Sequence, residues 1–187
     1  DIDEATVAAA KVTYFEGYMW DTDNQKKAIL KAMDYTAASG GLVSISLSDS
    51  FCVDRFRGEF LDLIRDRVDI LFANEDEIKS LYEVDSFEEA VELLRPHVQV
   101  GALTRSDKGS MIIAGSETIE VSADKVDVID TTGAGDMYAA GFLYGYTNGR
   151  ALDICGKLGS LAAGEVISHL GARPEAALDG LAKARGL

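Results

Sequence analysis

The feature that most constrains the fold is an alternation of two kinds of segment along the first half of the chain. Apolar runs rich in β-branched and aromatic residues, which are typical of strands, lie at residues 12–18, 42–47, 68–73 and 98–103. Segments with helical spacing lie between and beside them, at residues 23–38, 54–65, 75–82 and 86–94. This β-α alternation predicts a mostly parallel sheet covered by helices.

The second half of the chain has a different pattern. Short runs at residues 110–113 and 118–121 flank Gly115 like a hairpin, and a run at 126–129 predicts one more strand. Helical segments follow at residues 134–146, 150–169 and 175–184, the last of them after Pro174. Because no repeat, linker or internal boundary is recognisable, we predict one α/β domain.

The charge and apolar content of the chain exclude two classes of protein. It has 187 residues, of which 47% are hydrophobic, and a formal net charge of −14. These values fit neither a disordered polar chain nor a basic nucleic-acid binder, so we expect no nucleic-acid partner. Since an acidic surface repels phosphorylated ligands, a phosphate site has to be made locally, from backbone N–H groups, a few cations or a metal.

The cysteine, histidine and hydropathy patterns argue against a zinc protein and against a membrane protein. Cys52 and Cys155 form no CxxC pair, and His97 and His169 stand far apart, so a zinc site is not expected. No apolar run approaches the roughly 20 residues of a membrane span and no signal peptide opens the chain, so we expect a cytoplasmic protein without a membrane partner. The chain opens at Asp1 without Met, which suggests truncation.

A glycine-rich turn, DTTGAGD at residues 130–136, joins the last predicted strand to a helix. Glycines let the backbone approach a ligand closely, and the unpaired N–H groups at a helix start attract an anion such as phosphate. Asp136 would repel that anion unless it has a separate task, such as taking a proton from an attacking hydroxyl. The alternative is that the glycines only make a turn and Asp136 only favours the helix dipole.

The stretch DTTGAGDMYAAG at residues 130–141 resembles the C-terminal signature of the PfkB carbohydrate kinase family, which includes ribokinase, fructokinases and adenosine kinase. The resemblance implies that Asp136 is the general base and that the amides of Gly133, Ala134 and Gly135 form an anion hole. No GxxxxGK[ST] loop occurs, and no GxGxxG follows a strand. The P-loop and dinucleotide-binding classes are therefore not favoured.

The segment NEDE at residues 74–77 looks like the N-x-x-E motif of that family. The resemblance links Asn74 and Glu77 to magnesium through water. The same residues also make a good helix start, with Asn74 as N-cap and Glu77 at the third helical position in a capping box. Both interpretations can hold together.

The turn TRSDKG at residues 104–109 resembles the nucleotide-binding T-x-G-x-x-G turn of the family, with Ser106 where the first glycine is expected. The resemblance assigns nucleotide binding to Thr104, Ser106 and Gly109. For the charged side chains of Arg105 and Lys108, a plain polar turn is the better interpretation.

Small residues on the helix predicted at 150–169, among them Gly159 and Ala163, could form a nucleotide-binding wall that leaves room for an adenine ring. Close helix packing is the alternative. The resemblance also implies a monovalent cation, K⁺ for example, near Asp130, Thr132 and Gly171. An aromatic cluster at residues 17–20 could line a cleft, although such clusters more often lie in the core.

The similarity runs from about residue 12 to residue 174, and GFLYG at 141–145 with GARP at 171–174 is nearest to bacterial adenosine-kinase-like members. It implies a ribokinase-like α/β fold with the N-terminal part and lid missing, so residues 1–187 would be the C-terminal portion of a single kinase domain. The missing N-terminal segment would then be a partner of this chain. A homodimer is a further expectation.

Two functions from different classes follow. The first is an ATP- and Mg²⁺-dependent phosphotransferase, a carbohydrate or nucleoside kinase in which Asp136 activates a hydroxyl of adenosine or a ribose-like sugar; the chain alone could be inactive. The second is a non-catalytic nucleotide-binding or assembly fragment that lacks the acceptor half of the site.

Overall fold

The computed structural model describes residues 2–187. Its strands, in chain order, are β1 (Val12–Glu16), β2 (Leu42–Ser46), β3 (Ile70–Asn74), β4 (Val100–Thr104), β5 (Ser110–Ala114) and β6 (Glu117–Val121). Its helices are α1 (Glu4–Ala8), α2 (Asp23–Ser39), α3 (Ser50–Asp66), α4 (Glu75–Tyr82), α5 (Phe87–Leu94), α6 (Ala134–Thr147), α7 (Leu152–Val166) and α8 (Leu178–Ala184). Short 3₁₀ turns are η1 (Gly17–Trp20), η2 (Arg95–His97) and η3 (Ser106–Lys108).

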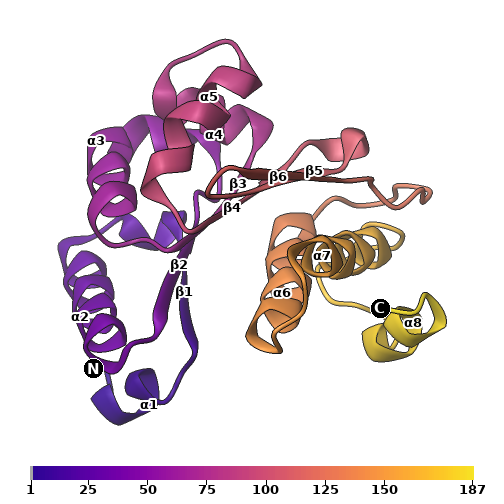
Figure 1. Ribbon diagram of the computed structural model, residues 1–187, viewed down its shortest axis with the longest axis horizontal. Coiled ribbons are helices and arrows are strands. Elements are labelled where there is room, and N and C mark those ends of the chain that lie inside the picture. The colour runs from indigo at the N-terminus through magenta and orange to yellow at the C-terminus, as the bar shows by residue number, and fades with distance from the viewer. Residues whose placement is uncertain (1) are drawn as a thin grey trace. The chain divides into compact units, whose positions relative to one another are not determined.

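The six strands form one mixed sheet in the order β1-β2-β3-β4-β5-β6, flanked by helices (Figure 1). This confirms the predicted α/β architecture. The described residues also pack into two compact units. Unit 1 holds those up to Leu103 together with Ile113–Glu117, and unit 2 holds Thr104–Ile112 and Thr118–Leu187. Nothing in the sequence indicates this division, because the chain changes unit within strands and short turns rather than at a linker.

In unit 1 the parallel register brings strand ends together. β1 pairs with β2 from Val12↔Leu42 to Glu16↔Ser46, and β2 pairs with β3 from Ser44↔Ile70 to Ser46↔Phe72. The carboxyl ends of these strands therefore share one edge, which is where ligands of open α/β sheets bind. Helix α2 packs on β1 and β2, and α3 packs against α4.

Side-chain caps explain where the helices of unit 1 begin. Thr22 accepts from the amide of Gln25 at the start of α2, and Asp49 accepts from the amide of Cys52 at the start of α3. The cap at Asp49 explains why α3 begins four residues before the predicted segment, since apolar spacing alone does not show the first turn of a helix.

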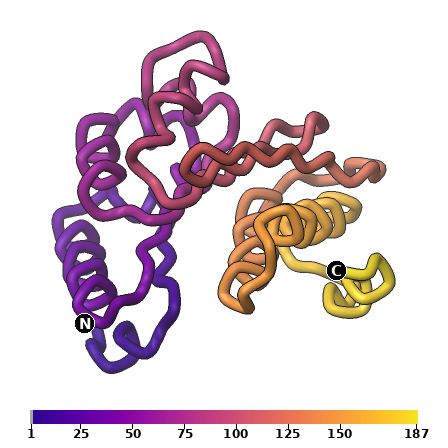
Figure 2. Tube along the Cα trace, viewed as in Figure 1, coloured from indigo at the N-terminus to yellow at the C-terminus, as the bar shows by residue number. Residues whose placement is uncertain are grey.

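In unit 2, α6 and α7 lie side by side (Figure 2). Two glycines allow their close approach. A Cβ added at Gly141 would lie 2.4 Å from the carbonyl oxygen of Leu158, and one added at Gly159 would lie 2.9 Å from that of Tyr138. Both additions would force the helices apart, so the small residues here serve packing.

Two predicted boundaries in unit 2 are wrong. Residues 126–129 are not a strand: Val128 and Ile129 are 59% and 58% exposed, and the amide of Ile129 bonds to the carbonyl oxygen of Ile167 instead of a strand neighbour. Helix α8 begins at Leu178 rather than at 175, because the amides of Glu175 and Ala176 are held by the Glu165 carboxylate.

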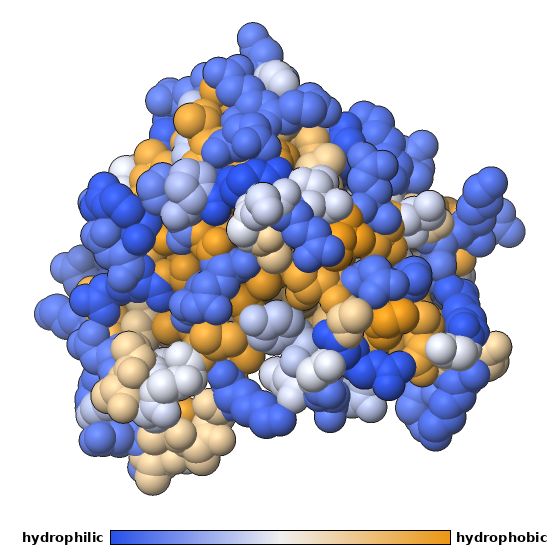
Figure 3. Space-filling view, in the orientation of Figure 1, coloured by the Kyte–Doolittle hydropathy of each residue, from blue (hydrophilic) through white to orange (hydrophobic). Residues whose placement is uncertain are grey.

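Hydrophilic residues cover most of the face seen in Figure 3, and hydrophobic ones show between them. Among residues 2–187, no helix combines the length and the apolar character needed to cross a bilayer.

Candidate active site

At the carboxyl end of β3, Asn74 and Glu77 form the predicted capping box. The Asn74 Oδ1 accepts from the Glu77 amide at 2.8 Å, while the two Glu77 carboxylate oxygens accept from the Asn74 amide at 2.9 Å and from its Nδ2 at 2.7 Å. The start of α4 is therefore closed by its own side chains, and the predicted cap is confirmed.

Glu77 is a buried carboxylate, only 5% exposed, in an acidic neighbourhood. Burial raises its pKa to about 7, the bond from the Asn74 amide opposes this, and the charges of Asp49, Glu16 and Asp76 raise it further. Glu16 in turn accepts a hydrogen bond from the Ser48 hydroxyl at 2.7 Å. Several negative groups thus share this edge of unit 1, a situation that a bound cation relieves.

The donor set at this edge fits magnesium held through water better than magnesium held directly. Both carboxylate oxygens of Glu77 are occupied inside the capping box. No group of three or more His, Cys, Asp or Glu among residues 2–187 could ligate a metal. Mg²⁺ usually keeps several of its waters, so a few carboxylates that contact those waters are sufficient.

The aromatic cluster after β1 divides into two parts. Trp20 is 4% exposed and donates to the Glu59 carboxylate at 2.8 Å, so it belongs to the core. Tyr18 is 59% exposed, and Phe51, at the start of α3, is 87% exposed. The sequence analysis did not single out Phe51. Its position could have indicated it, because Phe51 lies two residues after the helix cap Asp49, in a helix that follows a strand.

In unit 2, the turn at 130–136 leads into α6 without a side-chain cap. Gly133 is the residue before the helix, with φ +80°, and no side chain caps the amides that follow it. A Cβ on Gly133 would lie 2.9 Å from the Cβ of Ala172, so a glycine is required for two reasons. The amides of Gly135 and Asp136 bond to no group among residues 2–187, which leaves them available to an anion.

Asp130 fixes the shape of that turn. Its carboxylate accepts from the Thr132 amide at 2.9 Å, the Thr132 hydroxyl at 2.6 Å and the Gly171 amide at 3.0 Å. The Thr132 hydroxyl, followed by the Gly171 and Thr132 amides, lowers the Asp130 pKa to about 2. Because its oxygens already serve the turn, a cation at Asp130 and Thr132 stays a prediction.

Asp136 lies exposed in the first turn of α6. Its carboxylate makes no hydrogen bond or ion pair within residues 2–187. It therefore differs from Asp130, whose oxygens are fully used, and from Glu77, which is buried. Of the carboxylates assigned to the site, Asp136 has the freedom that a proton acceptor needs.

The turn between β4 and β5 has the backbone of a glycine turn. Ser106 has φ +54°, a left-handed conformation that explains why the family pattern has glycine there. Gly109 has φ +91°, and a Cβ on it would lie 2.0 Å from the Val121 carbonyl oxygen. Thr104 is half-buried at the end of β4. The shape of the turn fits the family pattern, while nucleotide binding by these residues stays a prediction.

The structure gives Gly159 and Ala163 a packing environment. Gly159 is buried, and a Cβ there would meet the Tyr138 ring at 3.0 Å as well as its carbonyl oxygen. Ala163 is half-buried. Close packing of α6 on α7 accounts for Gly159 without a nucleotide, so its assignment to a nucleotide-binding wall stays a prediction.

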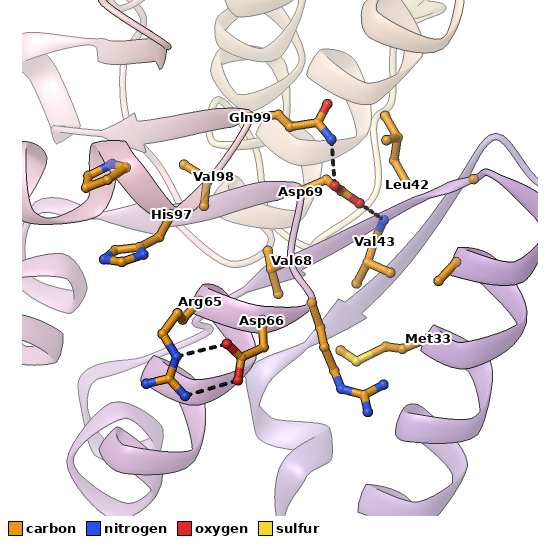
Figure 4. A pocket seen from close by; sticks show the side chains of 14 residues that line it. Met33, Leu42, Val43, Arg65, Asp66, Val68, Asp69, His97, Val98 and Gln99 are labelled. Atoms are coloured by element: carbon orange, nitrogen blue, oxygen red, sulfur yellow. Dashed lines mark hydrogen bonds and ion pairs between the residues drawn. The ribbon is translucent and has the colours of Figure 1, made fainter.

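Unit 1 also contains a groove of about 860 Å³ that lies away from these motifs (Figure 4). It is lined at the amino ends of β2, β3 and β4, and several of its polar groups are paired. The Asp69 carboxylate accepts from the Val43 amide at 2.8 Å and from the Gln99 Nε2 at 2.6 Å. Arg65 pairs with Asp66. The groove is at the opposite end of the strands from Asn74 and Glu77.

The sheet and its flanking helices define the class as a ribokinase-like α/β fold. The sequence matches the pfkB family carbohydrate kinases over residues 1–177, so the chain belongs to this family. An adenosine kinase from Sinorhizobium meliloti is 49% identical with a TM-score of 0.97 over 99% of this chain. A protein described as a probable sugar kinase from Rhizobium etli CFN 42 is 52% identical with a TM-score of 0.98 over 100% of it.

The relatives are longer than this chain. An uncharacterized sugar kinase from Archaeoglobus fulgidus is 29% identical over 153 residues, which are 82% of this chain and 58% of that protein. The chain likewise covers 57% of the Sinorhizobium and Rhizobium proteins. It thus spans a little over half the length of these three relatives.

Proposed function

We propose that this chain carries the base and the phosphate-binding turn of an ATP-dependent kinase that phosphorylates a hydroxyl of a sugar or nucleoside. The observation that carries the proposal is the start of α6. There, amides without a side-chain cap and an unpaired Asp136 carboxylate lie within one helical turn. An anion hole beside a free base is the arrangement that transfer of a phosphoryl group to a hydroxyl requires.

In this proposal, Asp136 accepts the proton of the acceptor hydroxyl as its oxygen attacks the γ-phosphorus of ATP. The bond from that phosphorus to the β,γ-bridging oxygen breaks, and ADP leaves. The amides of Gly133 and Gly135 stabilise the negative charge on the transferring group. The Ala134 amide, which the sequence analysis also assigned to the anion hole, instead donates to the Thr131 carbonyl oxygen at 3.2 Å. Asp130 contributes by holding the turn through Thr132.

Magnesium and nucleotide are assigned to the turns after β3 and β4. Asn74 and Glu77 would hold Mg²⁺ through its waters, and the metal would neutralise charge on the phosphates. Thr104, Ser106 and Gly109 would contact the nucleotide. A ribokinase-like protein from E. coli whose structure contains ATP and Mg²⁺ shares the fold at 18% identity and a TM-score of 0.88. K⁺ near Asp130 and Thr132 is part of the proposal.

For the acceptor we favour adenosine or a ribose-like sugar. The adenosine kinase from Sinorhizobium meliloti, at 49% identity, supports this choice. The exposed rings of Tyr18 and Phe51 follow β1 and β2 at the carboxyl edge of unit 1 and offer flat surfaces for a base. Because the relatives are longer, we propose that residues outside the printed sequence supply most acceptor contacts. A cytoplasmic location and a homodimer are expected as well.

The test measures ADP release by the full native polypeptide with adenosine, other nucleosides, ribose and fructose. We expect Asp136→Asn to lower kcat by about 10²- to 10⁴-fold, the usual range for a general base. Asp153→Asn, in the first turn of α7, is the matched control and should keep full activity. If Asp136→Asn turns over as fast as the parent, the base assignment is wrong.

The second hypothesis, a non-catalytic nucleotide-binding or assembly fragment, predicts a different result. Calorimetry with magnesium-ATP would then show binding by the 187-residue chain, while the full polypeptide would release no ADP with any acceptor. ADP release that depends on one acceptor excludes this second hypothesis.

A further inference from the structure

Glu165, at the end of α7, is a buried carboxylate to which the sequence analysis gave no role. Its side chain is 8% exposed. Its Oε1 accepts from the amides of Glu175 at 2.9 Å and Ala176 at 2.7 Å, ten and eleven residues further along the chain. Burial of a carboxylate is costly unless hydrogen bonds compensate it. The two amide bonds therefore make Glu165 part of the structure at the end of α7.

The two bonds close a loop. Residues 167–174 leave the end of α7 and return to Glu165, which also lies 3.4 Å from the Nε2 of His169 within that loop. The loop has no helix or strand of its own. Glu165 thus ties the far end of this loop to the end of α7.

The middle of the same loop supports the candidate phosphate-binding turn. The Gly171 amide donates to Asp130 Oδ2 at 3.0 Å, and Ala172 lies where a Cβ on Gly133 would meet it at 2.9 Å. Asp130 then holds the amide and hydroxyl of Thr132, directly before Gly133. One continuous set of contacts therefore runs from Glu165 through the loop to the anion hole.

We propose that Glu165 is a positioning residue for the phosphate-binding turn: by holding the amides of Glu175 and Ala176 it keeps Gly171 on Asp130, and so keeps the backbone amides at the start of α6 in place. The catalytic consequence rests on the proposed function; the structural one does not. A misplacement of about 1 Å in a catalytic group can cost about 10²-fold in rate.

Three variants separate this role from a general loss of stability. Glu165→Ala removes both bonds. Glu165→Gln keeps an amide oxygen that can accept from the same two N–H groups, and so should rescue. Asp153→Ala removes a carboxylate from the other end of α7, where it pairs with Lys157 at 2.9 Å, and serves as the matched control.

The main readout is hydrogen–deuterium exchange, which needs no activity. In Glu165→Ala we expect faster exchange in residues 168–176 and also in 130–136, with residues 153–162 unchanged. Glu165→Gln and Asp153→Ala should exchange like the parent. Unchanged protection of 130–136 in Glu165→Ala, or a Gln variant as defective as the Ala variant, would overturn the inference.

Kinetics supply the second readout. We expect Glu165→Ala to lower kcat by about 10- to 100-fold with little change in the KM for ATP, since the turn acts in the transition state. If Asp136→Asn proves fully active while the exchange result holds, the proposed function fails and the positioning role of Glu165 stands.

If Glu165→Ala does not fold, the parent protein itself provides the test. Native-state exchange in increasing urea should then give the amides of Thr132, Gly171, Glu175 and Ala176 the same free energy of opening, because one connection holds them all. Independent opening of the Thr132 and Glu175 amides would contradict the inference.

Discussion

Two helices of this protein begin in opposite ways, one after Asn74 at the end of β3 and the other after Gly133 in a turn. Helix α4 is closed by Asn74 and Glu77, whose side chains satisfy each other's backbone amides. Helix α6 begins at Gly133 with no side-chain cap and leaves amides without a protein partner. The polar groups at the start of α4 bond to one another, whereas the open amides at the start of α6 are available to a ligand.

The difference teaches how the two starts can take part in phosphate chemistry. The closed start can act only through its acidic side chains and through water, which suits a hydrated cation. The open start can act through backbone N–H groups, which suit an anion. Both are helix N-termini, so the helix dipole is common to them and does not explain their different assignments.

The largest expected effect comes from closing the backbone space at the open start. Gly133→Ala places a Cβ at φ +80° and 2.9 Å from Ala172. Left-handed strain of about 1 to 2 kcal/mol and overpacking of about 1 to 3 kcal/mol should together lower the free energy of unfolding by about 2 to 5 kcal/mol. Urea denaturation measures this, and kcat should fall in parallel.

Gly135→Ala is the matched control, because its added Cβ meets nothing within 4 Å. Its stability should stay within about 0.5 kcal/mol of the parent, or rise slightly because alanine favours helices. A loss of activity at unchanged stability would locate a close approach of the ligand at Gly135. A Gly133→Ala variant as stable as the Gly135→Ala variant would contradict the account of the turn.

The next effect belongs to the closed start and depends on pH. The folded-state pKa of Glu77 is about 7, above the ordinary value of 4.5. Between these values the folded state binds more protons than the unfolded state, so stability should fall as pH rises from 4.5 to 7. The Glu77→Gln variant cannot titrate at this position. Relative to it, the free energy of unfolding of the parent should fall by about 3 kcal/mol across that pH range.

Chemical denaturation of both proteins at several pH values, in EDTA, checks this difference. Repeating the series with Mg²⁺ sharpens it. A cation held near Glu77 favours the ionised carboxylate, so it should reduce the loss of stability between pH 4.5 and 7. If the stability difference between parent and variant does not change with pH, Glu77 titrates normally. The proposed magnesium site at the acidic edge near Glu77 would then lose its support.

How far these two starts could be predicted from the sequence differs for a physical reason. The capping box uses side chains, and so Asn74 and Glu77 were recognisable by type and spacing. The turn before α6 was recognisable through Gly133, Gly135 and its resemblance to a family. Its support was not, because the Gly171 amide bonds to Asp130 across 41 residues, and Glu165 holds amides ten and eleven residues further along the chain.

The same reasoning applies to the fold. The alternation of apolar runs and helical spacing predicted the sheet and most helices to within a few residues, because local periodicity controls them. The run at 126–129 has strand-like composition but lacks a strand neighbour to pair with, and composition cannot show the absence of a neighbour. The start of α8 depends on Glu165 binding the amides of Glu175 and Ala176, which is likewise a tertiary effect.

A smaller effect separates the cap function of Asn74 from its proposed role with magnesium. Asn74→Ala should cost about 1 kcal/mol of stability, as should Thr22→Ala at the equivalent capping box of α2. The two variants should then diverge in kinetics. Only Asn74→Ala should raise the magnesium concentration needed for half-maximal ADP release, and equal magnesium dependence in both would reduce Asn74 to a cap.

The smallest effect is expected at the turn after β4, which resembles the open start in using a left-handed residue, but occupies it with serine. Ser106 has φ +54°, a conformation that costs a side-chain-bearing residue about 1 kcal/mol and glycine almost nothing. The extra backbone entropy that glycine loses on folding offsets part of this gain, so Ser106→Gly should stabilise the protein by less than about 1 kcal/mol. If the turn binds nucleotide through its backbone, calorimetry should show unchanged affinity for magnesium-ATP in this variant. Weaker binding would mean instead that the Ser106 hydroxyl contacts the nucleotide. The turn after β4 would then act through a side chain, like the start of α4, and not through its backbone, like the start of α6.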